Sequence, residues 1–333
     1  MVIATRTAAA GNGIKVLALG LDVIEGASKA RDARRFAAMA ETLRARGYAF
    51  SLRRFDPAAE LGAACVATLE EEKPTIVFPS FYDRSLYGAL ASSGLPFVGS
   101  SARSLELLGS RSRLKKLWKD KGIDVPSYFL VQRTRSGPIS GRRLVVLAKD
   151  FPYIVRPDAE NGPCVSDAPS IAFDARALSS SVDACLVEHD ELIVEHFLGG
   201  FGAREYTVAM IGNGKDALML PAEIQLKEER PIRAATREDR LRGLVKAVAV
   251  ADEMRELLVT FARRALDAAS VRDYARCDLI EVEGRVCALD AKGLPPMPDP
   301  WFEECAAGAG LGPSEYITAI FEAALSRSKT SRK

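Results

Sequence analysis

Three charged residues in the carboxyl-terminal part of the chain have the types and spacing of a site for a metal ion and phosphate. Asp278 and Asp290 lie in two consecutive strand-like runs, 274–282 and 285–291, which flank a tight turn typical of an antiparallel hairpin. Pairing of the two strands would bring both carboxylates to one place, and Mg²⁺ or Mn²⁺ prefers such hard oxygen ligands. Arg276 precedes Asp278 by two residues, so alternation puts both side chains on one face. The alternative interpretation is an ordinary surface salt bridge.

Bulk properties narrow the class of protein. The chain has 333 residues, which suggests two or three subdomains. Its 48% hydrophobic and 27% charged residues are typical of a soluble globular protein, and a net charge of +2 argues against a broad surface for nucleic acid or membranes. No apolar run is long enough to span a bilayer.

Histidine and cysteine usage excludes further kinds of site. The six cysteines lack CxxC spacing, so we expect reduced thiols in a cytoplasmic protein rather than a zinc site or a disulfide framework. Only His189 and His196 are available for histidine-based catalysis, and the common alternative for each is a surface or interdomain side chain.

The amino-terminal hundred residues alternate between strand-like and helical patterns. We expect strands near 14–19, 48–53, 75–78 and 95–98, with helices near 29–46, 61–71 and 85–93. This period predicts an α/β unit with a parallel sheet. No GxGxxG follows the first strand, which argues against an NAD-dependent dehydrogenase.

The rest of the chain carries scattered strands and two long helical patterns. Strand-like runs are present at 153–155, 191–195, 205–211 and 217–224, and helical periodicity at 253–269 and 313–325. Residues 1–12 read as a flexible amino terminus. Residues 327–333, with four basic side chains, read as a solvated basic tail.

Four separated segments, in the same order, resemble the D-alanine–D-alanine ligase branch of the ATP-grasp superfamily. They are LPFVGS at 95–100, YIVRP at 153–157, IVEHFL at 193–198 with EYTV at 205–208, and YARCD at 274–278 with VCALD at 286–290. The resemblance spans most of the chain and implies an α/β (α+β) ATP-grasp fold. It also implies three divisions: a Rossmann-like domain at 13–104, a central ATP-grasp subdomain at 105–190 and a carboxyl-terminal one at 191–326.

The resemblance implies residues for an ATP site. Ile154 and Leu289 would hold the adenine, with Glu195, Phe197 and Leu198 at its edge and Glu205 on the ribose. Arg111 and Arg156 stand where the family has two phosphate-binding lysines, and a guanidinium keeps the charge and can grip phosphate bidentately. From the residues alone, Ile154 and Leu289 also fit plain strand core.

The resemblance implies an ADP-forming ligase of small, amino-acid-like substrates that works through an acylphosphate. Arg276 would stabilise the tetrahedral intermediate, and Asp278 and Asp290 would bind Mg²⁺ or Mn²⁺. Glu25 would hold the ammonium of the first substrate, although a glutamate favoured by a helix start explains it equally well. Homodimers are common among relatives, so a homodimer is also expected.

The chain departs from the family at positions that matter for chemistry. Lys292 occupies the place of an asparagine that ligates magnesium, and a protonated lysine has no lone pair to offer. Pro163 removes an amide donor from the phosphate-capping loop, and the expected closing loop at 225–240 lacks tyrosine. These departures favour a second hypothesis, a homologue that binds nucleotide or a partner without turnover.

Overall fold

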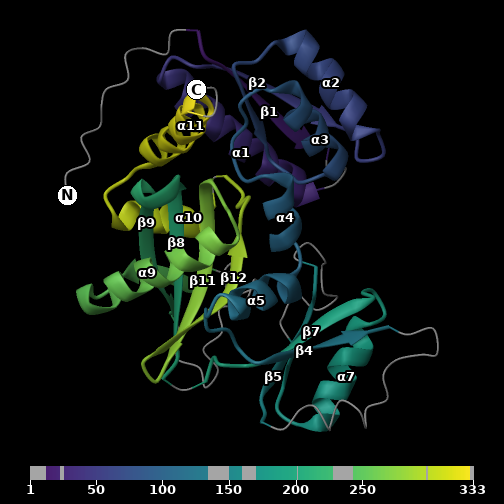
Figure 1. The fold of residues 1–333 in the computed structure, drawn as a ribbon, viewed down its shortest axis with the longest axis vertical. Coiled ribbons are helices and arrows are strands. Elements are labelled where there is room, and N and C mark those ends of the chain that lie inside the picture. Colours follow the sequence, from purple (N-terminus) through teal and green to yellow (C-terminus); the bar gives the residue numbers. More distant parts are fainter. Residues whose placement is uncertain are drawn as a thin grey trace.

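The computed structural model describes residues 13–22, 26–133, 150–159, 170–200, 202–227, 243–297 and 299–330. Three sheets follow one another along the chain (Figure 1). The expected amino-terminal segment 1–12, Glu25, Pro163 and most of the expected closing loop lie outside the described residues.

The amino-terminal part is the expected parallel α/β unit. Its three strands pair in the order β2-β1-β3, and Leu95–Val98, expected as a fourth strand, contributes only a bridge between Phe97 and Val77. The elements are β1 (Lys15–Leu21), α1 (Gly26–Ala45), β2 (Ala49–Phe55), α2 (Leu61–Glu72), β3 (Ile76–Pro79) and α3 (Arg84–Ser93).

Strand β1 is buried on both faces, which explains its continuous apolar sequence. Leu17 and Leu19 pack into the core that includes α2 and α3. Val16 and Ala18 pack into a second core with α1 and the carboxyl-terminal helix. The amino-terminal unit therefore shares core residues with the end of the chain.

The central part is an antiparallel sheet with one helix-covered face. Its strands are β4 (Tyr128–Gln132), β7 (Glu191–His196), β5 (Tyr153–Pro157) and β6 (Ser170–Ala172), in the order β4-β7-β5-β6. Tyr153, Val155 and Val194 pack against α7 (Ala175–Cys185). Because β7 pairs with β4 and β5, residues 191–196 belong to this sheet and not, as expected, to the carboxyl-terminal part.

Helices α4 (Ala102–Leu108) and α5 (Arg111–Asp120) connect the amino-terminal unit to the central sheet (Figure 1). Ser101 and Ser110 cap their amino termini by accepting hydrogen bonds from the backbone amides of Ser104 and Arg113.

The carboxyl-terminal part is a five-stranded antiparallel sheet in the order β10-β9-β8-β11-β12. Leu258, Ala262 and Ala265 of the long helix α9 pack in one core with Cys277 and Leu279 of β11. The elements are β8 (Arg204–Gly212), a short 3-10 turn η1 (Gly214–Asp216), β9 (Leu218–Leu226), β10 (Val245–Ala249), α9 (Asp252–Ala268), β11 (Asp273–Val282), β12 (Arg285–Lys292), α10 (Pro300–Gly308) and α11 (Pro313–Thr330).

The end of the chain is a helix rather than a solvated tail from residue 327. Arg327 lies in α11, and its guanidinium contacts the fully buried carboxylate of Asp273 at 2.8 Å. The same carboxylate accepts hydrogen bonds from the Gly99 amide and from Asn213. This Asp273 hub ties α11 and the segment between α3 and α4 to the start of β11, so the predicted tail is wrong for residues 327–330.

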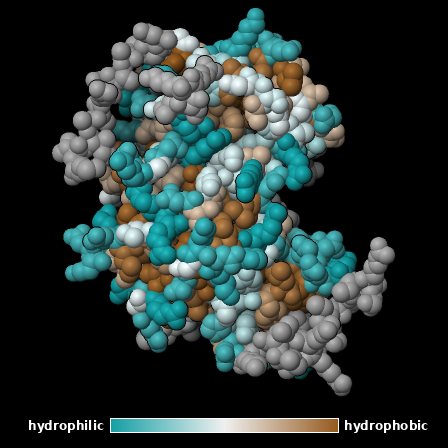
Figure 2. Space-filling model, viewed as in Figure 1, coloured by the Kyte–Doolittle hydropathy of each residue, from teal (hydrophilic) through white to brown (hydrophobic). Residues whose placement is uncertain are grey.

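Hydrophilic residues cover most of the described face in Figure 2, with hydrophobic residues in patches between them. Within the described ranges, no helix combines the length and the apolar character needed to cross a membrane.

Candidate active site

The hairpin of β11 and β12 places its charged residues as the sequence predicts. Asp278 pairs directly with Asp290, and Arg276 pairs with Lys292. The connecting turn has positive φ angles at Glu283 (51°) and Gly284 (80°), as a two-residue hairpin turn requires. The register shifts after Asp278, so that Leu289 is an extra residue beside the acidic pair.

Arg276 is enclosed by two carboxylates. Its Nε and one terminal nitrogen donate to Asp278 at 3.0 and 3.1 Å, and its other terminal nitrogen donates to Asp299 at 3.0 and 3.2 Å. The side chain is 3% exposed, and the attraction of both carboxylates outweighs burial and raises the pKa of Arg276. Thr207 of β8 donates a further hydrogen bond to Asp278 at 2.9 Å.

Asp299 has two tasks at the start of α10. Its carboxylate accepts from the Phe302 amide at 3.0 Å as the helix cap and also binds Arg276. An aspartate followed by proline is a recognised helix-start pattern, because proline suits the first helical position. This pattern in the sequence could have identified the start of α10, but not the contact of Asp299 with Arg276.

Arg111 is held at the amino terminus of α5 by main-chain carbonyls. One terminal nitrogen donates to the carbonyl oxygens of Pro157 and Ala159 at 2.8 and 2.9 Å. Its Nε lies 3.4 Å from Asp290 as an ion-pair contact that lacks hydrogen-bond geometry. Asp158, which was not predicted, accepts from the Ser112 amide at 2.7 Å and fixes the helix start beside β5.

Glu195 is buried beneath two cations. Its carboxylate pairs with Arg156 of β5 and with Lys115 of α5, whose ammonium lies 2.8 Å away. Burial alone would raise the pKa of Glu195, but Arg156 and Lys115 outweigh it and lower that pKa. The side chain of Glu195 is therefore engaged by two cations, and its contact with an adenine edge stays a prediction.

Lys115 also joins the central sheet to the carboxyl-terminal hairpin. Its ammonium donates to the carbonyl oxygen of Leu289 at 2.8 Å, next to Asp290. Burial lowers the pKa of Lys115, while the neighbouring Glu195 opposes that shift. Lys115 was not predicted as a site residue. It could have been found from the sequence because it lies four residues after Arg111, which puts both side chains on one face of a helix.

These groups form one network around Asp290. Burial opposes ionisation, but the cations Arg111, Arg156, Lys292 and Lys115 together lower the pKa of Asp290. We call the following nine residues the charged cluster: Arg111, Lys115, Arg156, Glu195, Arg276, Asp278, Asp290, Lys292 and Asp299. Its five cations exceed its four carboxylates, so the cluster suits an added anion.

Apolar residues lie beside the charged cluster. Leu198 and Leu289 pack against Ile280 in one small group. Glu205 pairs in register with Ile280, which places the predicted ribose contact next to this group. Ile154 and Arg156 are two residues apart on β5, so their side chains lie on the same face of the sheet.

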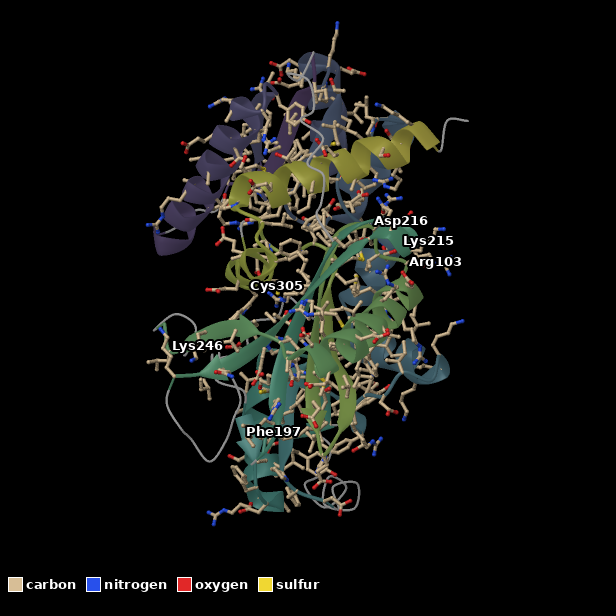
Figure 3. All side chains as sticks on the ribbon, turned by 90° about the vertical axis from the view of Figure 1, so that its left-hand side faces the viewer. Arg103, Phe197, Lys215, Asp216, Lys246 and Cys305 are labelled. Atoms are coloured by element: carbon tan, nitrogen blue, oxygen red, sulfur yellow. The ribbon has the colours of Figure 1, made fainter. Side chains whose placement is uncertain are left out.

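Phe197 follows directly after β7, and its amide donates to the Pro152 carbonyl at 2.8 Å. Figure 3 shows Phe197 at the central sheet, far from Cys305 of α10 and from Lys246 of β10. The predicted adenine residues therefore come from two sheets, with Leu289 in the five-stranded sheet and the others in or directly after the strands of the four-stranded sheet. Glu25 lies outside the described residues.

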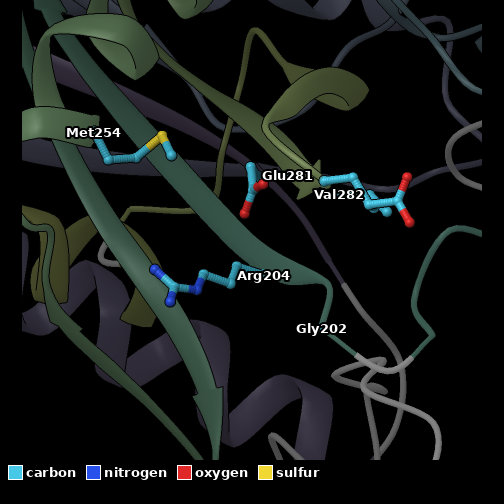
Figure 4. A pocket seen from close by; sticks show the side chains of 6 residues that line it. Gly202, Arg204, Met254, Glu281 and Val282 are labelled. Carbon is cyan, nitrogen blue, oxygen red and sulfur yellow. The ribbon is translucent and has the colours of Figure 1, made fainter.

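A separate cavity of about 430 Å³ opens at the end of the five-stranded sheet (Figure 4). It is lined by Gly202, Arg204, Met254, Glu281, Val282 and Glu283. None of these six lining residues belongs to the charged cluster, but Val282 packs in the same apolar group as Leu198 and Leu289.

Asp278 and Asp290 are the carboxylates that could hold a divalent cation here, and Lys292 does not fit as a further ligand. Asp278 and Asp290 face each other across the hairpin, as a shared ion requires. Within the described part of the chain, no cluster of three or more histidine, cysteine, aspartate or glutamate side chains could hold a metal ion. Lys292, on the same strand face as Asp290, offers no lone pair while protonated.

Solved structures share the architecture of this chain. A D-alanine–D-alanine ligase from Bacillus anthracis complexed with ATP matches with a TM-score of 0.72 at 18% identity over 96% of this chain and 99% of that one. The VanG D-Ala:D-Ser ligase from Enterococcus faecalis matches with a TM-score of 0.71 at 15% identity. The VanG match covers 94% of this chain and the whole of that one. The sheets and the site between them therefore define an ATP-grasp fold, as predicted.

Sequence comparison gives the family. The family model "D-ala D-ala ligase C-terminus" matches residues 117–322. The chain is 28% identical to a D-alanine–D-alanine ligase from Chromohalobacter salexigens over 76% of this chain and 79% of that protein. It is 27% identical to one from Coprothermobacter proteolyticus over 78% and 83%. The chain belongs to the D-alanine–D-alanine ligase family of ATP-grasp ligases, which confirms the resemblance.

Proposed function

We propose that the chain is an ATP-dependent ligase that joins a carboxylate to an amine. The observation that carries this proposal is the pairing of Asp290 with Asp278 across the hairpin, with Arg111 3.4 Å from Asp290 and Lys292 two residues after it on the same strand. Phosphoryl transfer depends on cations and carboxylates held in fixed positions around the phosphates. The ligases among its relatives support the same activity for this chain.

Each part of the site has a task in this reaction. Arg111 and Arg156 would hold the phosphates of ATP, and the apolar group around Leu198 and Leu289 would accept the adenine. Glu205 would bind the ribose. Asp278 and Asp290 would hold a divalent cation, which neutralises phosphate charge when bound.

The chemistry proceeds in two steps. An oxygen of the substrate carboxylate attacks the γ-phosphorus of ATP, the bond to the bridging oxygen breaks, and ADP leaves with formation of an acylphosphate. The amine then attacks the acyl carbon, loses a proton and expels phosphate. Arg276 lies in the cluster where it would stabilise the negative charge of the tetrahedral intermediate.

The substrates are proposed from the family and from Glu25. Relatives named for D-alanine, and a D-Ala:D-Ser ligase among the structural matches, indicate small amino acids as the substrate class. Glu25 would hold the ammonium of the first substrate. We also propose that the chain is cytoplasmic and forms a homodimer. We propose three subdomains at 13–104, 105–196 and 197–330, with the second boundary placed after β7 because that strand pairs within the four-stranded sheet.

A nucleotide-binding homologue without turnover is the second candidate. All three guanidinium nitrogens of Arg276 already donate hydrogen bonds to Asp278 or Asp299. These bonds compete with the proposed role of Arg276 in stabilising the tetrahedral intermediate. This enclosure of Arg276 favours binding over catalysis.

ADP release separates the two candidates. We would measure ADP with ATP, Mg²⁺ and a panel of D- and L-amino acids and hydroxy acids, for the native chain, Asp290→Asn and the remote control Lys246→Asn. The ligase predicts ADP that depends on an added amino acid, is lost in Asp290→Asn and is retained in Lys246→Asn. ATP binding without ADP release under every condition would favour the homologue without turnover.

A further inference from the structure

The hairpin pairs like charges directly across its two strands. Arg276 lies opposite Lys292, and Asp278 lies opposite Asp290. Directly opposed like charges destabilise an antiparallel pair unless other charges offset them. Arg276 is offset by Asp278 and Asp299. Lys292 lies two residues after Asp290 on β12, so the ammonium and that carboxylate share one strand face.

A second divalent cation is incompatible with this arrangement. Such an ion would need a further oxygen ligand on the hairpin face, and the residue after the acidic pair on that face is Lys292. A protonated ammonium supplies no ligand and repels a cation in a partly buried site. The same ammonium can instead contact phosphate oxygens.

We propose that Lys292 takes the place of one divalent ion, so that the chain binds the nucleotide triphosphate with a single metal ion between Asp278 and Asp290. This inference rests on the proposed nucleotide site and specifies its metal requirement. Arg111 and Arg156 are anchored beforehand by main-chain carbonyls and by Glu195, so their charges are in place without a second ion.

Counting bound Mn²⁺ tests the proposal independently of turnover. The native chain with a saturating non-hydrolysable ATP analogue is titrated with Mn²⁺, and free Mn²⁺ is followed by electron paramagnetic resonance. We expect one Mn²⁺ per bound nucleotide in the native chain and in Lys246→Asn, a lysine of β10 at the opposite edge of the sheet. Lys292→Asn, which restores an oxygen ligand, should bind two. Two ions in the native chain would overturn the proposal.

Affinity without metal provides the second readout. In excess EDTA, Lys292→Asn should bind the analogue about tenfold to hundredfold more weakly than the native chain, because a charge-assisted contact to phosphate is lost. Mn²⁺ should restore most of that affinity. Equal affinities of the two proteins in EDTA would contradict the role of Lys292.

The outcomes also separate this inference from the proposed function. Two Mn²⁺ ions together with amino-acid-dependent ADP release would refute the single-ion site and leave the ligase standing. Absence of nucleotide binding in both EDTA and Mn²⁺ would refute both.

Discussion

Lys115 and Glu195 form a fully buried ion pair, 2.8 Å apart, between α5 and β7, and each side chain is only 1% exposed. The pair does more than join two elements. Glu195 also holds Arg156, and Lys115 also donates to the Leu289 carbonyl next to Asp290. One buried pair therefore sets the position of Arg156, the proposed phosphate-binding cation, and of β12, the strand that carries the proposed metal ligand Asp290, and these come from different sheets.

Breaking this pair from one side should be strongly destabilising. Lys115→Met leaves Glu195 buried with a single partner, and we expect a loss of about 3–5 kcal/mol in the free energy of unfolding. The double variant Lys115→Met/Glu195→Leu should lose less than the sum of the single variants, because each single variant already removes the Lys115–Glu195 interaction. Urea denaturation measures all three. Additive losses would show that the two side chains do not interact.

Acid should weaken the fold partly through Glu195. Its pKa is lowered in the folded protein, so it contributes stability that is present above its ordinary value of 4.5 and is lost as the pH falls through the folded value. The Glu195→Gln variant should be less stable at neutral pH but lose less stability on acidification. Urea midpoints at neutral pH and below 4.5 provide the comparison. An identical acid dependence in both proteins would exclude this contribution.

Asp299 should act on catalysis by positioning Arg276. Asparagine also caps helices well, so Asp299→Asn should keep the start of α10 and lose only the buried charge partner of Arg276, at a cost of about 3 kcal/mol in the free energy of unfolding. The lost charge partner should also lower kcat for ADP release by about tenfold to hundredfold, with the KM for ATP unchanged. Asp299→Ala serves as the comparison that loses both the cap and the pair. A native kcat in Asp299→Asn would show that the enclosure of Arg276 has no catalytic role.

The carboxyl-terminal helix should be required for stability through Arg327. Arg327→Met leaves the Asp273 carboxylate, which is fully buried, without its cation and should cost about 3 kcal/mol. Removal of residues 331–333 alone is the control and should leave the thermal midpoint unchanged. A midpoint in Arg327→Met equal to that of the control would mean that the Asp273 hub does not depend on this ion pair.

Local patterns were sufficient to predict much of the fold and the hairpin site. Alternation over 274–282 and 285–291, with a turn between them, predicts that Asp278 and Asp290 meet, and their register confirms it. The strand and helix period of the first hundred residues likewise predicts the parallel sheet. Both features depend on neighbours in sequence, where periodicity is informative.

Features that depend on distant contacts could not be predicted in this way. The residues of 191–196 predict a strand, but a strand pattern does not indicate which strand it pairs with. The pairing of β7 with β4 and β5, rather than with β8, therefore could not be predicted. The burial of Lys115 similarly depends on Glu195 and on the Leu289 carbonyl, which are distant in sequence. The sequence around Arg327 is that of a surface charge, and only the fold brings Asp273, 54 residues earlier in the chain, into contact with it.

Transfer of oxygen from carboxylate to phosphate tests the central claim, ligation through an acylphosphate, most directly. The amino acid that gives the fastest ADP release would be labelled with ¹⁸O in its carboxylate, and the phosphate produced would be analysed by mass spectrometry. The proposed chemistry predicts phosphate that carries one ¹⁸O atom, since a carboxylate oxygen attacks phosphorus and leaves with it. Phosphate without label would show that water attacks ATP instead, and would contradict the assignment of this chain as a carboxylate–amine ligase.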